Sequence, residues 1–181
     1  MKHLILILSI LLIPSLTFAQ SAKADRGIGL AIRSSVNSEL PSARVVPCIQ
    51  YLAGNHQLEL GLGLTPVLRE DQQVMSGEFS YQYFPNGTTN KFNGYLITSL
   101  SYVRRGVDTF FPTDYHYLFL DGGYGFLLHA GNGIYLGTHV TGGIFTYQKR
   151  TENPSIEFLQ VNLLESFEAH VTAHISLSYR F

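Results

Sequence analysis

Lysine and cysteine are scarce in this sequence, and each scarcity excludes a class of protein. After residue 19 the only lysines are Lys23, Lys91 and Lys149. The surface of a soluble protein normally carries many charges of both signs, so this composition is unusual for one. Cys48 is the single cysteine, which excludes an intramolecular disulfide. No basic residue adjoins Cys48 to favour a thiolate, and we expect a half-buried strand residue there.

A large excess of charge and a long apolar run are also absent. The formal net charge is −1, which excludes a polycationic nucleic-acid binder. The one apolar run, Leu4 to Ile13, is far shorter than the roughly 20 residues that a membrane-spanning helix needs. We expect no nucleic-acid partner and no cofactor.

The N-terminus has the pattern of an export signal. Lys2 and His3 precede the apolar run, and Ala19 supplies a small residue at the expected cleavage position. The next residue is Gln20 and not cysteine, so lipoprotein processing is not expected. We predict that residues 1–19 are a signal peptide and that residues 20–181 form a single domain.

The last fourteen residues, 168–181, alternate strictly between apolar and polar side chains. One face has Ala169, Val171, Ala173, Ile175, Leu177, Tyr179 and Phe181, and the other has Glu168, His170, Thr172, His174, Ser176, Ser178 and Arg180. A period of two is that of an extended strand. This strand ends on an aromatic residue.

Turn signals divide the rest of the chain into seven further extended segments. We place them at residues 27–34, 43–52, 56–65, 74–84, 92–104, 115–129 and 134–149. The connections alternate in length: short turns rich in glycine and asparagine at 53–55, 85–88 and 130–133, and longer polar segments at 35–42, 66–73, 106–114 and from 150. No segment has a helical period, so the sequence predicts an all-β chain.

The composition of the polar face indicates which face points inward. A soluble barrel would expose lysine and glutamate there, but this face has mostly glycine, serine and threonine, with isolated ionisable residues. Small polar residues suit the narrow lumen of an eight-stranded barrel. We therefore expect a polar lumen that contains Arg33, Glu59, Glu78, Asp121, His139, Glu168, His170, His174 and Arg180.

The aliphatic residues would then face lipid, and aromatic residues near strand ends would form two interfacial girdles. We expect one girdle to contain Tyr83, Phe84, Phe92, Tyr95, Tyr135, Tyr179 and Phe181, and the other Tyr102, Phe110, Phe111, Tyr115, Tyr117, Phe145 and Tyr147. The fold prediction is an eight-stranded antiparallel up-and-down transmembrane β-barrel with short periplasmic turns and longer external loops.

With this strand count, loop asymmetry and terminal Ile175-Ser-Leu-Ser-Tyr-Arg-Phe181, residues 26–181 resemble the small eight-stranded outer-membrane barrels of the OmpX and OmpA-transmembrane type. The resemblance implies an outer-membrane location and a monomer surrounded by lipid and lipopolysaccharide. It also implies that Ile175, Leu177, Tyr179 and Phe181 are recognised by the barrel-assembly machinery. It does not fix a function, because the family includes structural, adhesive and enzymatic members.

Two groups of residues suggest chemistry on the last strand. His170 and His174 resemble a metal pair, but four strand residues span about 13 Å, which is too far for one ion. His174, Ser176 and Glu168 share a face and are similar to the His/Ser pair of outer-membrane lipid A deacylases, with a carboxylate to orient the base. However, their phase turns them toward the lumen, which an acyl chain in the outer leaflet cannot reach.

Residues 158–167 continue the alternation in phase apart from Glu165, and we expect part of this stretch to project beyond the membrane as an exposed strand. The alternative starts the last strand near Ser166.

The sequence thus predicts a non-enzymatic barrel in envelope integrity or in surface interaction through its external loops. The alternatives are a barrel enzyme acting on lipid A or phospholipid, and a soluble secreted barrel that binds an apolar ligand. A diffusion porin is not expected, because eight strands leave no aqueous channel once interior side chains are packed, and the sequence leaves a narrow or gated conductance open.

Overall fold

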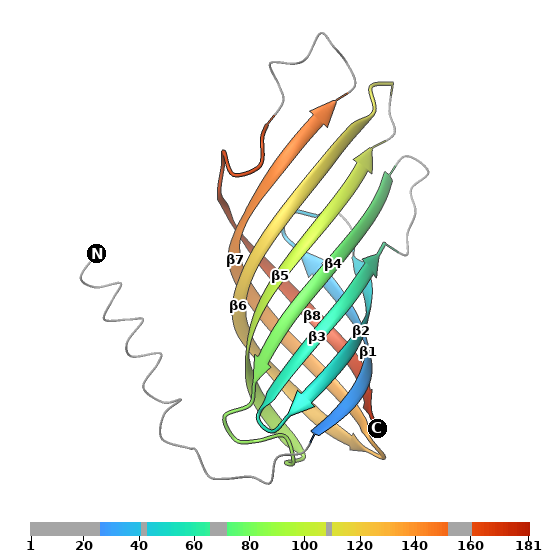
Figure 1. The fold of residues 1–181 in the computed structure, drawn as a ribbon, viewed down its shortest axis with the longest axis vertical. Coiled ribbons are helices and arrows are strands. Elements are labelled where there is room, and N and C mark those ends of the chain that lie inside the picture. The colour runs from blue at the N-terminus through green and yellow to red at the C-terminus, as the bar shows by residue number, and fades with distance from the viewer. Residues whose placement is uncertain (1–25, 41–42, 66–71, 108–109, 152–160) are drawn as a thin grey trace, which may run out of the picture.

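A computed structural model describes residues 26–40, 43–65, 72–107, 110–151 and 161–181, without the side chains of residues 72 and 73. The predicted signal peptide lies outside these residues. The described chain forms β1 (Arg26–Asn37), β2 (Arg44–Ala53), β3 (His56–Leu64), β4 (Gln72–Tyr83), β5 (Phe92–Val107), β6 (Thr113–Gly131), β7 (Ile134–Thr151) and β8 (Glu168–Arg180). Each strand pairs antiparallel with the next, and β8 closes the barrel on β1 (Figure 1).

The predicted all-β barrel is confirmed, and all eight predicted strands are present. Their boundaries agree to within about three residues, with β1 extending to Asn37 and β5 to Val107. In the described part of the chain, no helix has the length and apolar character needed to cross a membrane.

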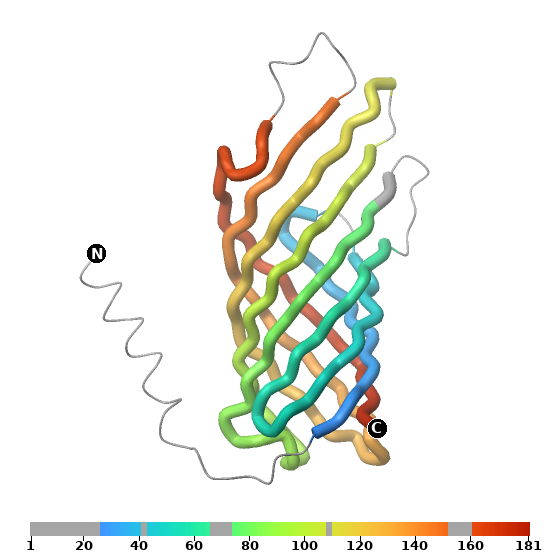
Figure 2. Tube along the Cα trace, in the orientation of Figure 1, coloured from blue at the N-terminus to red at the C-terminus, as the bar shows by residue number. Residues whose placement is uncertain are grey.

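The two ends of the barrel have different connections (Figure 2). At one end, which we call the short-turn end, tight turns join β2 to β3 and β6 to β7, with positive φ at Gly54 (63°) and Asn132 (51°). Arg26 pairs with Ala53 at this end, and the Phe181 amide donates to Ile28 O at 3.0 Å, so the described chain also starts and finishes there. The opposite end is the long-loop end.

The predicted four-residue turn at 85–88 is wrong in length. The connection between β4 and β5 runs from Phe84 to Lys91. Within it, the Gly87 amide donates to Phe84 O at 3.1 Å and closes a tight turn. The His129 amide donates to Lys91 O at 2.8 Å and continues the pairing of β5 with β6.

The wall of the barrel is taller on one side (Figure 1). Strands β5, β6 and β7 have 16, 19 and 18 residues, whereas β2 and β3 have 10 and 9. The three long strands therefore rise above their neighbours at the long-loop end.

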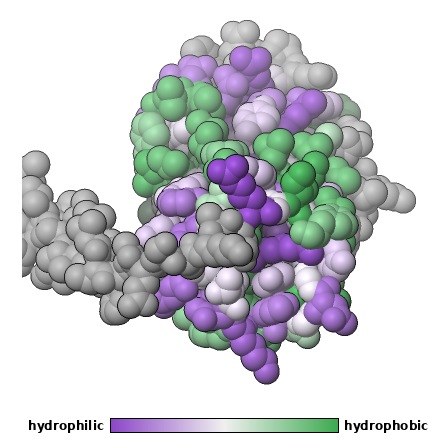
Figure 3. Space-filling model, turned by 60° about the horizontal axis from the view of Figure 1, so that its bottom comes forward, coloured by the Kyte–Doolittle hydropathy of each residue, from purple (hydrophilic) through white to green (hydrophobic). Residues whose placement is uncertain are grey.

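The outer surface of the wall is apolar. In β3 the outward residues Leu58, Leu60, Leu62 and Leu64 are 41–72% exposed. Hydrophobic residues lie on the sides of the barrel, while hydrophilic residues gather over the short-turn end (Figure 3). A closed sheet with an aliphatic outer surface meets the two requirements for crossing a membrane, because each strand is paired with two neighbours and lipid contacts apolar groups.

The lumen also contains two large apolar clusters, which correct the predicted girdles. Near the short-turn end Phe84, Tyr95, Ile97 and Leu127 form a buried apolar cluster, and near the long-loop end a second cluster contains Leu40, Val74, Val103, Tyr117, Phe119 and Phe145. Seven residues assigned to the lipid interface thus face inward. Phe84, Tyr95, Tyr117 and Phe145 are buried, and Tyr115, Tyr135 and Tyr147 pack against the two clusters. In β5 and β6 both faces have large apolar residues, so alternation alone does not reveal the phase.

The predicted projection of the last strand is wrong over residues 161–167. Strand β8 starts at Glu168, near the alternative start at Ser166. Before it, residues 162–165 form a turn in which Leu164 has a φ of 72°, and the side chain of Glu165 accepts from the Asn162 amide at 3.0 Å. A single bridge between Val161 and Lys149 resumes the pairing. Residues 158–160 lie outside the described part of the chain.

Candidate functional site

The centre of the lumen is an ionic network built around Arg33. Its guanidinium lies 3.2 Å from Glu59 Oε2 and 2.6 Å from Glu78 Oε2, and Arg44 Nη1 lies 3.0 Å from Glu78 Oε1. All four side chains are at most 5% exposed. Ions buried this deeply require partners, because desolvation costs several kcal/mol for each of them.

Neutral side chains satisfy the remaining oxygens of Glu59. Gln57 Nε2 donates to Oε1 at 2.8 Å, and Ser80 Oγ donates to Oε2 at 3.2 Å. Gln50, the register partner of Glu59, also donates to Oε1. Arg180 extends the network toward the short-turn end, donating to Gln57 Oε1 at 2.7 Å with its guanidinium 4.2 Å from the ring centroid of Tyr135.

The lumenal histidines belong to two separate groups. The His174 ring stacks on that of His139 at 4.1 Å, and His139 Nδ1 lies 2.9 Å from the hydroxyl of Tyr95. His170 instead lies between the rings of Phe119 and Phe145, with Nδ1 3.0 Å from Asn37 Nδ2 and Nε2 2.8 Å from Asp121 Oδ1. Among the described residues, no group of three His, Cys, Asp or Glu side chains is arranged to hold a metal ion.

The structure does not bring together the three residues of the deacylase-like hypothesis. His174 is buried, with no hydrogen bond to its Nδ1 from another described residue, and Ser176 is half-buried beside Gly137. Glu168 is exposed at the start of β8, which corrects its predicted lumenal position. The separation of six positions between Glu168 and His174 corresponds to about 20 Å along a strand.

Cys48 is buried, at 4% exposure, and its thiol donates to Val46 O at 3.3 Å. It packs with Ala31 and Val46, as a strand residue of the lumen.

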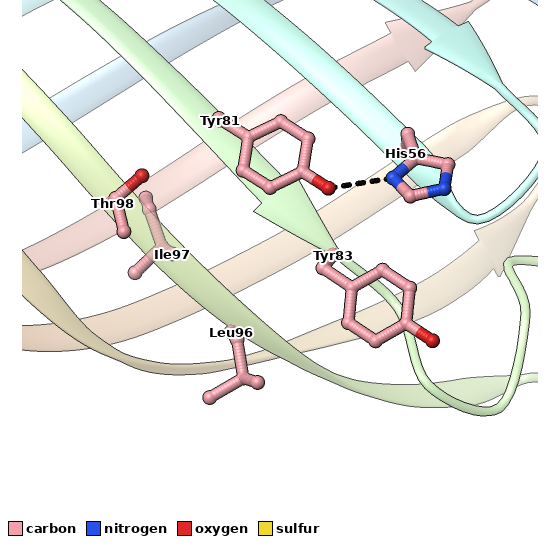
Figure 4. Close-up of a pocket in the computed structure, with 6 residues that line it drawn as sticks. All are labelled: His56, Tyr81, Tyr83, Leu96, Ile97 and Thr98. Carbon is pink, nitrogen blue, oxygen red and sulfur yellow. Dashed lines mark hydrogen bonds between the residues drawn. The ribbon is translucent and has the colours of Figure 1, made fainter. Parts of the chain in front are cut away.

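The outer wall has two hydrogen-bonded Tyr–His pairs that sequence reasoning missed. On β3 and β4, His56 Nδ1 lies 2.6 Å from the Tyr81 hydroxyl, with the rings stacked (Figure 4). On β5 and β6, His116 Nδ1 lies 2.5 Å from the Tyr102 hydroxyl, again with stacked rings. The first pair is near the short-turn end, and the second lies toward the long-loop end.

A charged group follows the second pair on the tall side of the wall. Arg104 Nη2 donates to Asp114 Oδ2 at 3.0 Å, and Arg150 is the register partner of Asp114 on β7. The Arg104 and Asp114 side chains are 57% and 39% exposed. The sequence could have revealed these residues, because each is a polar residue at a position that belongs to the outward, otherwise apolar face of its strand.

Solved structures share this barrel fold. The N-terminal β-barrel domain of OprF from Pseudomonas aeruginosa superimposes with a TM-score of 0.64 at 9% identity, over 88% of this chain and 100% of that domain. Neisserial surface protein A (NspA) matches with a TM-score of 0.45 at 12% identity, over 88% of this chain and 98% of that one. The sequence matches no family model and no curated protein. At such identities the likeness establishes the fold alone.

Proposed function

We propose that this chain is a non-enzymatic outer-membrane barrel that contributes to envelope integrity by holding lipopolysaccharide at the long-loop end of β5–β7. The proposal places the short-turn end, where the described chain starts and finishes, in the periplasm, and the long-loop end at the cell surface. It also gives Ile175, Leu177, Tyr179 and Phe181 their role in assembly.

The observation that supports this function is the group formed by Arg104, Asp114 and Arg150 with the Tyr102–His116 pair. These side chains point outward where the apolar surface of the tall wall ends. Phosphate groups on a lipid A sugar would meet two guanidinium groups at this level, and arginine binds phosphate through two parallel hydrogen bonds. Asp114 would hold Arg104 in place, while Tyr102 and His116 suit the boundary between acyl chains and sugars.

The test is the amount of lipopolysaccharide that co-purifies with the barrel. We expect R104A/R150A to retain about tenfold less than the wild type, since a hydrogen bond to a charged group contributes about 1.5–3 kcal/mol. The variant should also fail to restore the permeability barrier of a deletion strain to hydrophobic dyes. The matched control is Arg26→Ala, which removes an exposed arginine at the opposite end. Equal lipopolysaccharide on all three proteins would contradict the proposal.

The lipid composition of the cells distinguishes an enzymatic role from the proposed function. We expect His174→Ala and Ser176→Ala to leave the acylation of lipid A and the phospholipid profile unchanged. A change in either profile that these variants abolish would replace our proposal with a lipid-modifying activity.

A further inference from the structure

We propose that a trough on the outer wall near the short-turn end binds one glycerophospholipid of the inner leaflet. The trough has a volume of about 430 Å³ and is lined by His56, Tyr81, Tyr83, Leu96, Ile97 and Thr98 (Figure 4). This inference rests on the proposed outer-membrane location and orientation. It does not involve the arginines at the long-loop end.

The trough exists because neighbouring strands have outward side chains of unequal size. Tyr81 and Tyr83 of β4 are paired in register with the smaller Thr98 and Leu96 of β5. The Tyr81 ring leans away from β5 toward His56 on β3, where its hydroxyl is hydrogen-bonded (Figure 4). The Tyr83 ring is also packed near His56, with centroids 5.3 Å apart. Both rings therefore form one side of the trough and leave the surface of β5 uncovered.

Polar groups surround an otherwise apolar floor. When the Tyr81 hydroxyl donates to His56 Nδ1, the neutral imidazole carries its hydrogen on Nε2, which becomes a free donor. The hydroxyls of Tyr83 and Thr98 form no hydrogen bond with another residue in the described ranges, and the Tyr83 hydroxyl points away from His56 (Figure 4). Three donors thus border a floor that includes Leu96.

This combination matches the head of a glycerophospholipid. Phosphate and ester oxygens accept hydrogen bonds, and an acyl chain fits an apolar floor that continues into the aliphatic wall. The wall at this level is surrounded by lipid, so the occupant must be a membrane molecule. At the periplasmic end of an outer-membrane barrel, the surrounding leaflet consists of glycerophospholipid, whereas lipopolysaccharide occupies the opposite leaflet.

Native mass spectrometry of the barrel released from phosphatidylethanolamine/phosphatidylglycerol nanodiscs tests this site. We expect the wild type to retain one phospholipid, and H56F/Y83F to retain it about tenfold less. These substitutions keep two aromatic rings but remove two hydrogen-bonding groups, each contributing a few-fold to the affinity. The matched control is Tyr51→Phe, which removes the hydroxyl of another outward tyrosine near the same end and should retain the lipid fully. Equal retention by wild type and H56F/Y83F would overturn the proposal.

A cross-linking measurement identifies the occupant with a probe placed beside the site. With Leu100→benzoylphenylalanine, at an outward position of β5 outside the trough lining, irradiation in outer-membrane vesicles should yield a barrel–phospholipid adduct. A lipopolysaccharide adduct, or a covalent dimer of the barrel, would overturn the assignment. Neither result depends on Arg104 or Arg150, so this proposal and the proposed function can fail separately.

Discussion

Arg33 contacts both carboxylates at the centre of the lumen, and its loss would affect them differently. Glu78 would keep Arg44 as its partner at 3.0 Å. Glu59 would lose its cation, since no other Lys, Arg or His of the described ranges lies within ion-pair distance of it. The charge balance of the lumen therefore depends on this one side chain more than on any hydrogen bond around it.

Arg33→Met is expected to destabilise the folded barrel by about 3–5 kcal/mol, because it leaves a buried carboxylate without a counter-charge. Urea unfolding in lipid vesicles measures this. R33M/E59Q should recover a large part of the loss, since the amide removes the unpaired charge. Arg26→Met, at an exposed position, should change stability by less than about 0.5 kcal/mol. A double variant as unstable as R33M would show that packing, and not charge, determines the loss.

At the scale of a secondary-structure element, β8 serves two purposes with its two faces. Its inward residues His170, Thr172 and His174 complete the lumen, and its outward residues Ile175, Leu177 and Tyr179 are 44–70% exposed. Phe181 follows the strand at 76% exposure and contacts the Tyr179 ring edge-on at 5.0 Å. So exposed a ring adds little to packing, which leaves recognition during assembly as its expected role.

Phe181→Ser should therefore reduce the amount of barrel assembled in cells several-fold, while refolding of the purified chain into detergent stays close to that of the wild type. Heat-modifiable mobility on gels measures both. Phe92→Ser removes another exposed aromatic ring near the short-turn end and serves as the control. Equal assembly defects in the two variants would contradict a specific role for the terminal residue.

At the scale of the whole molecule, the lumen is filled in three layers. An apolar cluster that includes Phe84 and Tyr95, the ionic network, and the cluster around Phe119 follow one another from the short-turn end to the long-loop end. Inward side chains of this size occupy the interior of an eight-stranded barrel and leave no room for a porin-type channel.

Planar-bilayer recordings should accordingly show no steady current of the size that porins conduct. Protein with heat-modifiable mobility has to be used, so that misfolded material is excluded. A stable open state at low voltage would contradict the filled lumen and favour a transport function.

For every strand whose two faces differ in polarity, the sequence was sufficient to predict both the strand and the direction of its side chains. In β3 four outward leucines alternate with Gln57, Glu59 and glycines, so both the element and its orientation follow from the period of two. In β6 the run from Tyr115 to Leu120 has large residues on both faces, and the pattern predicts a strand without a phase. The girdle assignments of Tyr115 and Tyr117 were wrong for that reason.

Of the lumenal network, the sequence predicted Arg33, Glu59 and Glu78 as members, but it predicted neither Arg44 nor the pairing of these residues. Arg33, Glu59 and Glu78 are 19–45 positions apart, and barrel closure with its register brings them together. The trough was missed because His56 lies on an apolar face as a lone polar residue. Its role in the trough depends on the hydrogen bond with Tyr81 of the neighbouring strand.

The architecture could be predicted from the sequence, because alternation, short glycine turns and a lysine-poor polar face are local properties of the chain. The directions of the aromatic side chains became known from the packing of neighbouring strands. Tyr95 turns inward because Gly125 on the adjacent strand has no side chain: a Cβ there would lie 2.3 Å from the Tyr95 ring. The space for such a side chain is provided by a neighbouring strand, so it cannot be predicted from the sequence of one strand alone.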